Sequence, residues 1–388
     1  MTLITAGLLG GCGISSGAET PAVSAETVKT TEENEMKIYI PNEENVKQIG
    51  RTELIDDTLW CALSGSGAEF LVSASRAEIT VAGDNIAVIS DNDSNYARYA
   101  IYVNDEKVVD EVMNKPEKTH VIFDGDTEQE AVVRIIKLSE SAMSTIGIRD
   151  IAVNSDTAVR PAAEKKHKIE FIGDSITCGY GVDDEDKDHH FSTATEDVTK
   201  AYAYKTAEAL DADYSMVAYS GHGIISGYTD NGQKTQQLVP KYYKRTGFSY
   251  GSFAGRQVSA IDWDFSRFEP ELIVINLGTN DDSYCQNDSA RQEEFAKQYT
   301  VFLKQIREKN PDAKILCTLG IMGSRLYDYI ELAVYNYTQE TGDDNIATFK
   351  FDNQEPSDGL AADWHPTEAT QDKAAKKLTA EISELMGW

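Results

Sequence analysis

The hydrophobic pattern of this chain changes near residue 160, and that change limits the possible folds more than any other feature. From Lys37 to Asp156, apolar and polar residues alternate in short runs such as Ala77-Glu-Ile-Thr-Val, separated by clusters of Gly, Asp, Asn and Ser. Period-two alternation with frequent turn residues is typical of an antiparallel β-sandwich. We therefore predict a β-sandwich domain over residues 37–156, with strands at 68–73, 77–81, 99–103 and 132–136.

After Pro161 the pattern becomes that of an α/β protein. Continuous apolar runs begin at residues 169, 215, 272, 314 and 347, and helix-length segments cover 201–210, 290–309, 326–340 and 367–386. Strands buried on both faces that alternate with helices are typical of a doubly wound parallel sheet. We predict such a domain over residues 157–388, and we expect its functional residues at the carboxyl ends of its strands.

The charge of the chain restricts its partners. The 388 residues contain 65 Asp plus Glu against 36 Lys plus Arg, a formal net charge of -29. An acidic surface repels nucleic acid and anionic membranes, because both bind through neutralising cations. We therefore expect no nucleic-acid partner and a surface that suits neutral or cationic ligands. We also expect a monomer.

The first residues predict export. An apolar run from Met1 ends in Leu9-Gly-Gly-Cys12, which resembles the lipobox of bacterial lipoproteins. The resemblance implies a lipoprotein-type signal and flexible tether over residues 1–36. It also implies that the protein is exported, either as a lipoprotein of the bacterial cell surface or as a secreted protein. The membrane would then be contacted only through an N-terminal lipid. An ordinary flexible tail is the alternative.

The remaining cysteines do not predict a metal centre. Their spacing fits no zinc pattern, and sequence alone leaves their pairing open. They are Cys61, Cys178, Cys285 and Cys317. We expect Cys178 to pack in the core, and we expect the acidic segment 183–188, with the two histidines after it, to be a solvated loop. We predict no metal and no cofactor.

Two motifs supply a nucleophile and a base. Ser175, in Gly173-Asp-Ser-Ile-Thr, directly follows the first strand of the α/β half, where a tight turn presents its hydroxyl. His365 directly precedes the last helix, and its ordinary pKa leaves a nitrogen free to accept a proton near pH 7. For Ser175 alone the alternative is a phosphate-binding or helix-capping serine, and for His365 alone it is a structural histidine.

Two further motifs supply hydrogen-bond donors. Tyr219-Ser-Gly-His-Gly223 follows the second strand, and its glycines let a backbone N–H approach an oxyanion. Asn280 ends the third strand with a neutral amide, a second suitable donor, whereas we expect the adjacent Asp281 to shape the loop. His222 is a rival base, although its sequence neighbours offer no orienting carboxylate.

These four blocks, in this order, resemble the SGNH hydrolase superfamily, also called the GDSL-like lipases and esterases. The resemblance implies a flavodoxin-like catalytic domain in which Ser175 is the nucleophile and His365 the base. It implies an oxyanion hole formed by Ser175, Asn280 and Gly223, with Gly221 as the alternative glycine.

The orienting carboxylate departs from the superfamily pattern. Most members carry it three residues before the histidine, where this chain has Ala362. Asp363 stands two residues before the histidine and is our candidate for the third catalytic residue. A backbone carbonyl of the same turn is the alternative.

A narrower resemblance extends into the β-rich half. Gly50-Arg-Thr, Ala62-Leu-Ser-Gly-Ser-Gly-Ala-Glu-Phe and the block from Gly173 to Gly181 resemble carbohydrate esterase family two, which joins a jelly-roll domain to an SGNH domain. The resemblance implies removal of O-acetyl groups from xylan or glucomannan, with acetylated poly- or oligosaccharide as the partner. Trp364 and Tyr180 are then candidates for stacking on sugar, with packing as the alternative.

Two other functions stay open from sequence. One is a lipase or thioesterase of the same superfamily that acts on longer acyl chains. The other is a surface protein that mainly binds carbohydrate.

Overall fold

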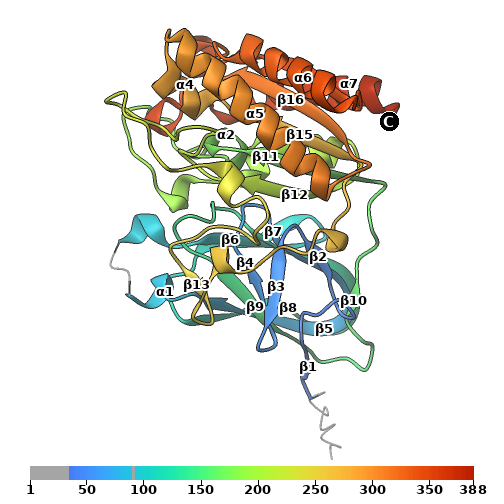
Figure 1. Ribbon diagram of the computed structural model, residues 1–388. Coiled ribbons are helices and arrows are strands. Elements are labelled where there is room, and N and C mark those ends of the chain that lie inside the picture. The colour runs from blue at the N-terminus through green and yellow to red at the C-terminus, as the bar shows by residue number, and fades with distance from the viewer. Residues whose placement is uncertain (1–34, 90–91) are drawn as a thin grey trace, which may run out of the picture. The chain divides into compact units, whose positions relative to one another are not determined.

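The β-rich half is organised around two long strands. The computed structural model describes residues 35–89 and 92–388, of which residues 36–388 belong to one compact unit (Figure 1). Strand β5 (Gly67–Gly83) pairs with β8 (Glu117–Lys137) along almost its whole length. The other strands of this sheet are β1 (Lys37–Tyr39), β2 (Lys47–Ile49), β3 (Thr52–Ile55), β4 (Thr58–Cys61), β6 (Arg98–Val103), β7 (Glu106–Val112), β9 (Ile146–Val153) and β10 (Arg160–Pro161).

These ten strands are hydrogen-bonded into one continuous sheet, with the main order β3-β4-β9-β5-β8-β6-β7. The prediction of separate strands at 68–73 and 77–81 is wrong, because both lie within β5. The residues between them include no glycine or proline, and register shifts near residues 74–78 let the strand bend without ending. Beyond the predicted boundary at 156, β10 still pairs with β5. One short helix, α1 (Ile86–Ile89), follows β5.

The second half contains the predicted parallel sheet. Its order is β12-β11-β15-β16-β17, and every neighbouring pair is parallel. The strands are β11 (His167–Gly173), β12 (Ala212–Ala218), β15 (Leu272–Asn276), β16 (Lys314–Ile321) and β17 (Ile346–Asn353). All five predicted apolar runs lie in these strands. The carboxyl ends of β11, β12 and β15, which are neighbours, therefore meet at one edge.

Helices cover both faces of this sheet (Figure 1). Apolar residues of α5 (Ser289–Lys309) and α6 (Tyr327–Thr341) pack in one core with β15 and β16. Those of α3 (Tyr202–Ala209) and α7 (Glu368–Met386) pack in a second core with β11 and β12. The short helices α2 (Ser175–Cys178) and α4 (Thr279–Cys285) begin where β11 and β15 end.

The two halves share buried contacts. Arg51, which is fully buried and comes from the β-rich half, pairs with Glu170 of β11 at 3.1 Å. The hairpin of β13 (Ser252–Phe253) and β14 (Arg256–Gln257) returns to the β-rich half, where Phe253 stacks on Trp60 with 5.5 Å between ring centroids.

Some sequence predictions concern residues outside the described ones. The lipobox-like motif and most of the tether lie in residues 1–34, so the predicted signal, lipid anchor and cell-surface location stay predictions. Within the described ranges, no helix combines the length and apolar character needed to span a bilayer. The four described cysteines are free and buried, so the open question of their pairing is answered.

Candidate active site

Ser175 and His365 meet at the carboxyl edge of the parallel sheet. Ser175 is the first residue of α2, and the Asp174 side chain caps this helix by accepting the Ile176 N–H. His365 lies in the loop before α7, and its Nε2 is 2.8 Å from the Ser175 Oγ. The structure thus brings together two residues that are 190 positions apart in the chain.

Two backbone carbonyls orient the imidazole. The Nδ1 of His365 lies 3.1 Å from the carbonyl oxygen of Ala362 and 3.2 Å from that of Asp363. Because carbonyls only accept, Nδ1 carries the proton and Nε2 is left to accept from the serine hydroxyl. Burial lowers the pKa of His365 from 6.5 to about 4, so the ring is neutral at pH 7.

The prediction that the Asp363 carboxylate orients His365 is wrong. That carboxylate accepts the Tyr180 hydroxyl at 2.6 Å and the Phe191 N–H at 3.1 Å, and it lies 2.9 Å from His190 Nδ1. The φ angles of Asp363 and Trp364 are 49° and 65°. This left-handed turn presents backbone oxygen, and not carboxylate, to the imidazole, as the alternative interpretation expected.

The two aromatic candidates occupy different environments. Tyr180 stacks on His365, with 3.9 Å between ring centroids and 21° between planes, so one of its faces is covered by the base. Trp364 is 54% exposed and lies on the wall of the adjoining cavity, with the Lys187 ammonium 4.5 Å from its ring centroid. Tyr180 therefore packs against the base, whereas Trp364 is open to a ligand.

An open cavity of about 540 Å³ lies in front of the serine. Its lining comes from the ends of β11, β12, β15 and β16 and from the turn before α7. The lining residues are Ser175, Tyr180, Ser220, Gly221, Tyr228, Thr279, Asn280, Asp282, Ser283, Met322, Asp363, Trp364 and His365.

The choice of Gly223 as an oxyanion donor is corrected to Gly221. The Gly223 N–H donates to the carbonyl of Gln237 at 3.1 Å, so it is already used. Gly221 lines the cavity with a φ of 72°, and within the described part of the chain its N–H has no protein acceptor. The N–H of Ser175 likewise has no protein acceptor within the described residues.

Asn280 also lines the cavity. Its side-chain nitrogen donates to the His222 carbonyl at 2.9 Å and lies 3.3 Å from the Asp174 carboxylate, so one hydrogen is held only weakly. The Asp281 carboxylate accepts N–H groups of residues 224, 225 and 226, which confirms its predicted role in shaping the loop. His222 places Nδ1 on the Ser220 carbonyl at 2.9 Å, and Ser175 is paired with His365 instead.

Sequence reasoning missed a buried polar group beside the site. Carboxylates of Glu140 and Glu196 and the thiol of Cys178 lie within 4.8 Å of one another. Burial raises the pKa of the Cys178 thiol well above its usual range, so the thiol stays protonated and is a poor metal ligand. No motif marks Glu140, which lies in the β-rich half.

Comparison with known proteins places this site in a family. Residues 171–373 match the GDSL-like lipase/acylhydrolase family. The chain belongs to this family. In front of this GDSL-like domain, residues 48–162 match the N-terminal domain of carbohydrate esterase family two.

The GDSL-like chain is similar in sequence to curated proteins. The cellulase/esterase CelE of Acetivibrio thermocellus is 30% identical over 334 residues, which cover 84% of this chain and 38% of CelE. This chain therefore spans well under half of that relative. An acetylxylan esterase/glucomannan deacetylase of Cellvibrio japonicus is 27% identical over 355 residues, covering 89% of this chain and 90% of the relative.

Solved structures share the two-part architecture of this GDSL-like protein. A family two carbohydrate esterase from Clostridium thermocellum, in complex with cellohexaose, is 28% identical with a TM-score of 0.76, covering 88% of this chain and 99% of that one. An acetyl xylan esterase from the rumen bacterium Butyrivibrio proteoclasticus, 22% identical, matches the fold with a TM-score of 0.81 over 91% and 99% of the two chains.

Proposed function

We propose that this protein is a serine esterase that removes O-acetyl groups from plant cell-wall polysaccharide such as xylan or glucomannan. The observation that carries the proposal is the 2.8 Å contact between Ser175 Oγ and His365 Nε2 at the wall of an open cavity. A hydroxyl beside a neutral imidazole is the arrangement that activates serine as a nucleophile. The activities named for CelE and for the Cellvibrio japonicus relative support the same reaction.

The first half of the reaction acylates the serine. His365 Nε2 takes the hydroxyl proton while Ser175 Oγ bonds to the acetyl carbonyl carbon. The resulting oxyanion accepts from the N–H groups of Ser175 and Gly221 and from the weakly held amide hydrogen of Asn280. The intermediate collapses, the bond to the sugar oxygen breaks, and His365 returns the proton to that oxygen.

The second half releases acetate. Water attacks the acetyl-serine while His365 Nε2 accepts a proton from it, and the same three donors hold the second oxyanion. Collapse frees acetate and restores the Ser175 hydroxyl with the proton from His365. The two carbonyls on Nδ1 stabilise the imidazolium formed in each half, the role that a carboxylate fills in a full triad.

The cavity lining supports a short acyl group on a sugar. Met322 is the single aliphatic residue of the lining, whereas a long acyl chain gains affinity by burying apolar surface. The rings of Tyr228 and Trp364 are 61% and 54% exposed, and both lie on the cavity wall. Exposed aromatic rings suit the apolar faces of sugars.

The alternative of a carbohydrate-binding surface protein depends on this same cavity. In the described part of the chain, four aromatic residues are strongly exposed, and two of these lie on the wall of this cavity. They are Tyr228, Tyr250, Tyr335 and Trp364. The relative crystallised with cellohexaose supports a chain of sugars as the ligand class.

A chain-length series tests the proposal. We expect p-nitrophenyl acetate to be cleaved best, with kcat/KM falling by about tenfold or more at octanoate, because Met322 is the only aliphatic side chain of the cavity lining that could pack on a longer acyl chain. Acetylated xylan and glucomannan should both be tried for acetate release. Activity that rises with chain length would favour the lipase alternative, and binding of polysaccharide without any hydrolysis would favour the binding protein.

A further inference from the structure

Glu140 of the β-rich half contacts the loop that carries the proposed oxyanion donor. It lies just after β8, and its side chain is only 1% exposed. Its Oε2 accepts the backbone N–H of Ser220 at 2.8 Å. Ser220 immediately precedes Gly221, so a carboxylate from one half of the chain is bonded to a cavity loop of the other.

Glu140 is itself held firmly in place. Its backbone N–H donates to the Glu196 carboxylate at 2.7 Å, and its carbonyl accepts from the Lys137 ammonium at 2.7 Å. Lys137 and Glu196 are both fully buried. Buried polar groups require hydrogen-bond partners, so these contacts fix the Glu140 backbone on both sides.

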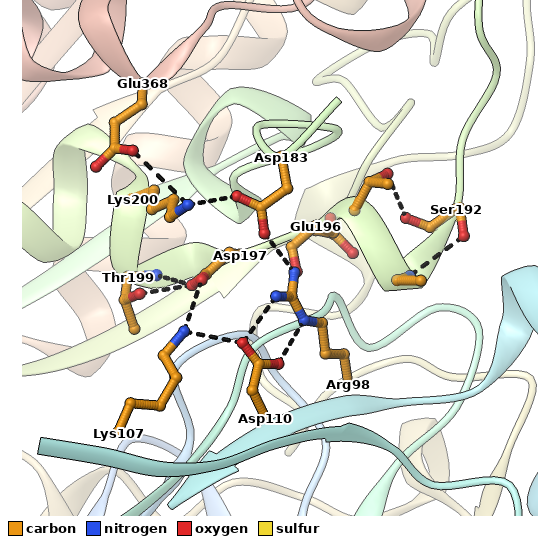
Figure 2. A network of polar contacts seen from close by, with 12 residues as sticks. Arg98, Lys107, Asp110, Asp183, Ser192, Glu196, Asp197, Thr199, Lys200 and Glu368 are labelled. Carbon is orange, nitrogen blue, oxygen red and sulfur yellow. Dashed lines mark hydrogen bonds and ion pairs between the residues drawn. The ribbon is translucent and has the colours of Figure 1, made fainter. Parts of the chain in front are cut away.

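A partly exposed ion-pair network fixes the segment that carries Glu196 (Figure 2). Arg98 of β6 contacts Asp110 of β7 and reaches Asp183 at 2.6 Å. Asp183 also pairs with Lys200 at 2.5 Å. Asp183 and Lys200, the two ends of segment 183–200, are thus both part of this network. Arg98 links the segment to the β-rich half.

The Gly221 loop depends on hydrogen bonds for its position. A side chain at Gly221 would meet no heavy atom within 4 Å, so packing does not hold this residue from that direction. Its carbonyl accepts from Tyr228 N–H at 2.9 Å, and the next carbonyl, that of His222, accepts from Asn280. The bond from Ser220 N–H to Glu140 fixes the side of the loop nearest the β-rich half.

We propose that Glu140 is a positioning residue for the oxyanion hole. Its carboxylate holds Ser220, and through it the Gly221 N–H, at the place where the oxyanion forms. Donors must lie within about 2.7–3.1 Å of that place, and a displacement of about 1 Å can cost on the order of 100-fold in rate. The inference rests on the proposed esterase function. It gives the β-rich half a role in positioning the oxyanion hole.

Three substitutions test the role of the carboxylate. Glu140→Ala removes the acceptor, Glu140→Asp withdraws it by one methylene, and Glu140→Gln keeps an acceptor oxygen at the same reach. Glu170→Gln is the matched control, because Glu170 is another buried carboxylate that joins the two halves, through Arg51. Kinetics with p-nitrophenyl acetate are run below the unfolding temperature of every variant.

We expect kcat to fall by about 10- to 100-fold in the Ala and Asp variants with KM within about threefold, because the lost contact acts on the transition state. Glu140→Gln should restore kcat to within about threefold of the wild type, and Glu170→Gln should keep kcat whatever its unfolding temperature. Combined with Asn280→Ala, Glu140→Asp should cost less than the product of the two single effects, because both act on one oxyanion.

The set of variants separates an effect on folding from an effect on catalysis. If Glu140→Ala does not fold, the Asp and Gln variants still decide the question. A folded Glu140→Asp enzyme with wild-type kcat, or full additivity with Asn280→Ala, would overturn the positioning role. Those results would leave the proposed esterase function intact. A wild-type protein without esterase activity would instead contradict the proposed function, on which the positioning role rests.

Discussion

The ring of Tyr180 lies almost flat against the imidazole of His365, with 3.9 Å between centroids, while its hydroxyl donates to the Asp363 carboxylate at 2.6 Å. The stack limits rotation of the imidazole, so Nε2 stays directed at Ser175. Asp363 thus helps to orient His365 in two ways. Its backbone carbonyl contacts Nδ1, and its side chain fixes the ring that packs on the imidazole.

Removing the Tyr180 ring should therefore lower the rate more than removing its hydroxyl. We expect Tyr180→Ala to reduce kcat by about tenfold or more, because the imidazole gains freedom to leave the reactive orientation. Tyr180→Phe keeps the stack and should lose only a few-fold. Steady-state kinetics on p-nitrophenyl acetate measure both, and equal losses in the two variants would contradict the positioning role of the ring.

The Asp363 side chain should matter much less than the aspartate of a full triad. In a serine protease triad, replacing the aspartate costs about 10⁴ in kcat. Here the carbonyls of residues 362 and 363 orient the imidazole, so we expect Asp363→Ala to lose about tenfold or less. A loss near 10⁴ in a folded variant would show that the carboxylate acts on the base directly.

The acid limb of the pH profile should lie at unusually low pH. Burial lowers the pKa of His365 from 6.5 to about 4, and the neutral ring is the active form. The logarithm of kcat/KM should therefore stay level as pH falls through 6.5 and decline only nearer pH 4 to 5. The control is circular dichroism at each pH, and a midpoint at or above 6.5 in folded protein would contradict this account.

The same shift has a consequence for stability. A histidine whose pKa is lower in the folded state than in the unfolded state stabilises the fold above the unfolded pKa. This contribution is lost as pH falls from 6.5 towards 4. Comparing the pH dependence of unfolding in the wild type and in His365→Gln isolates it, since the variant should lose less stability across this window.

The two glycines of the loop after β12 should respond differently to alanine. A Cβ at Gly223 would stand 2.1 Å from the Ser226 carbonyl oxygen and 2.5 Å from the Asp281 carboxylate, so Gly223→Ala should destabilise the fold by several kcal/mol. Gly221→Ala meets open space and carries only the cost of a φ of 72°, about 1–2 kcal/mol. Thermal unfolding of both variants tests the difference, and the reverse order would contradict the loop geometry.

The sequence predicted those parts of the structure that local pattern encodes. Strand β15 was expected from its apolar run and is observed at Leu272–Asn276. Ser175 and Asn280 follow neighbouring parallel strands, so the order of the sheet was enough to bring them to one edge, where His365 joins them from the loop before α7.

The remaining details depend on contacts between distant residues. Gly221 and Gly223 look equivalent in sequence, and contacts with distant residues distinguish them, such as the bond from Gly223 to Gln237. The direction of the Asp363 carboxylate follows from a left-handed turn that neither Asp nor Trp specifies. Glu140 lies 80 positions before Ser220, in a segment whose own pattern indicates only a strand end.

Acetate release from acetylated glucomannan and xylan, compared between the wild type and Ser175→Ala, tests the central claim most directly. The account predicts release by the wild type and a loss of at least about 10³-fold in a variant with an unchanged unfolding temperature, because the nucleophile is gone. A folded Ser175→Ala protein that releases acetate at the wild-type rate would contradict it, and catalysis would then have to be sought outside the Ser175–His365 pair.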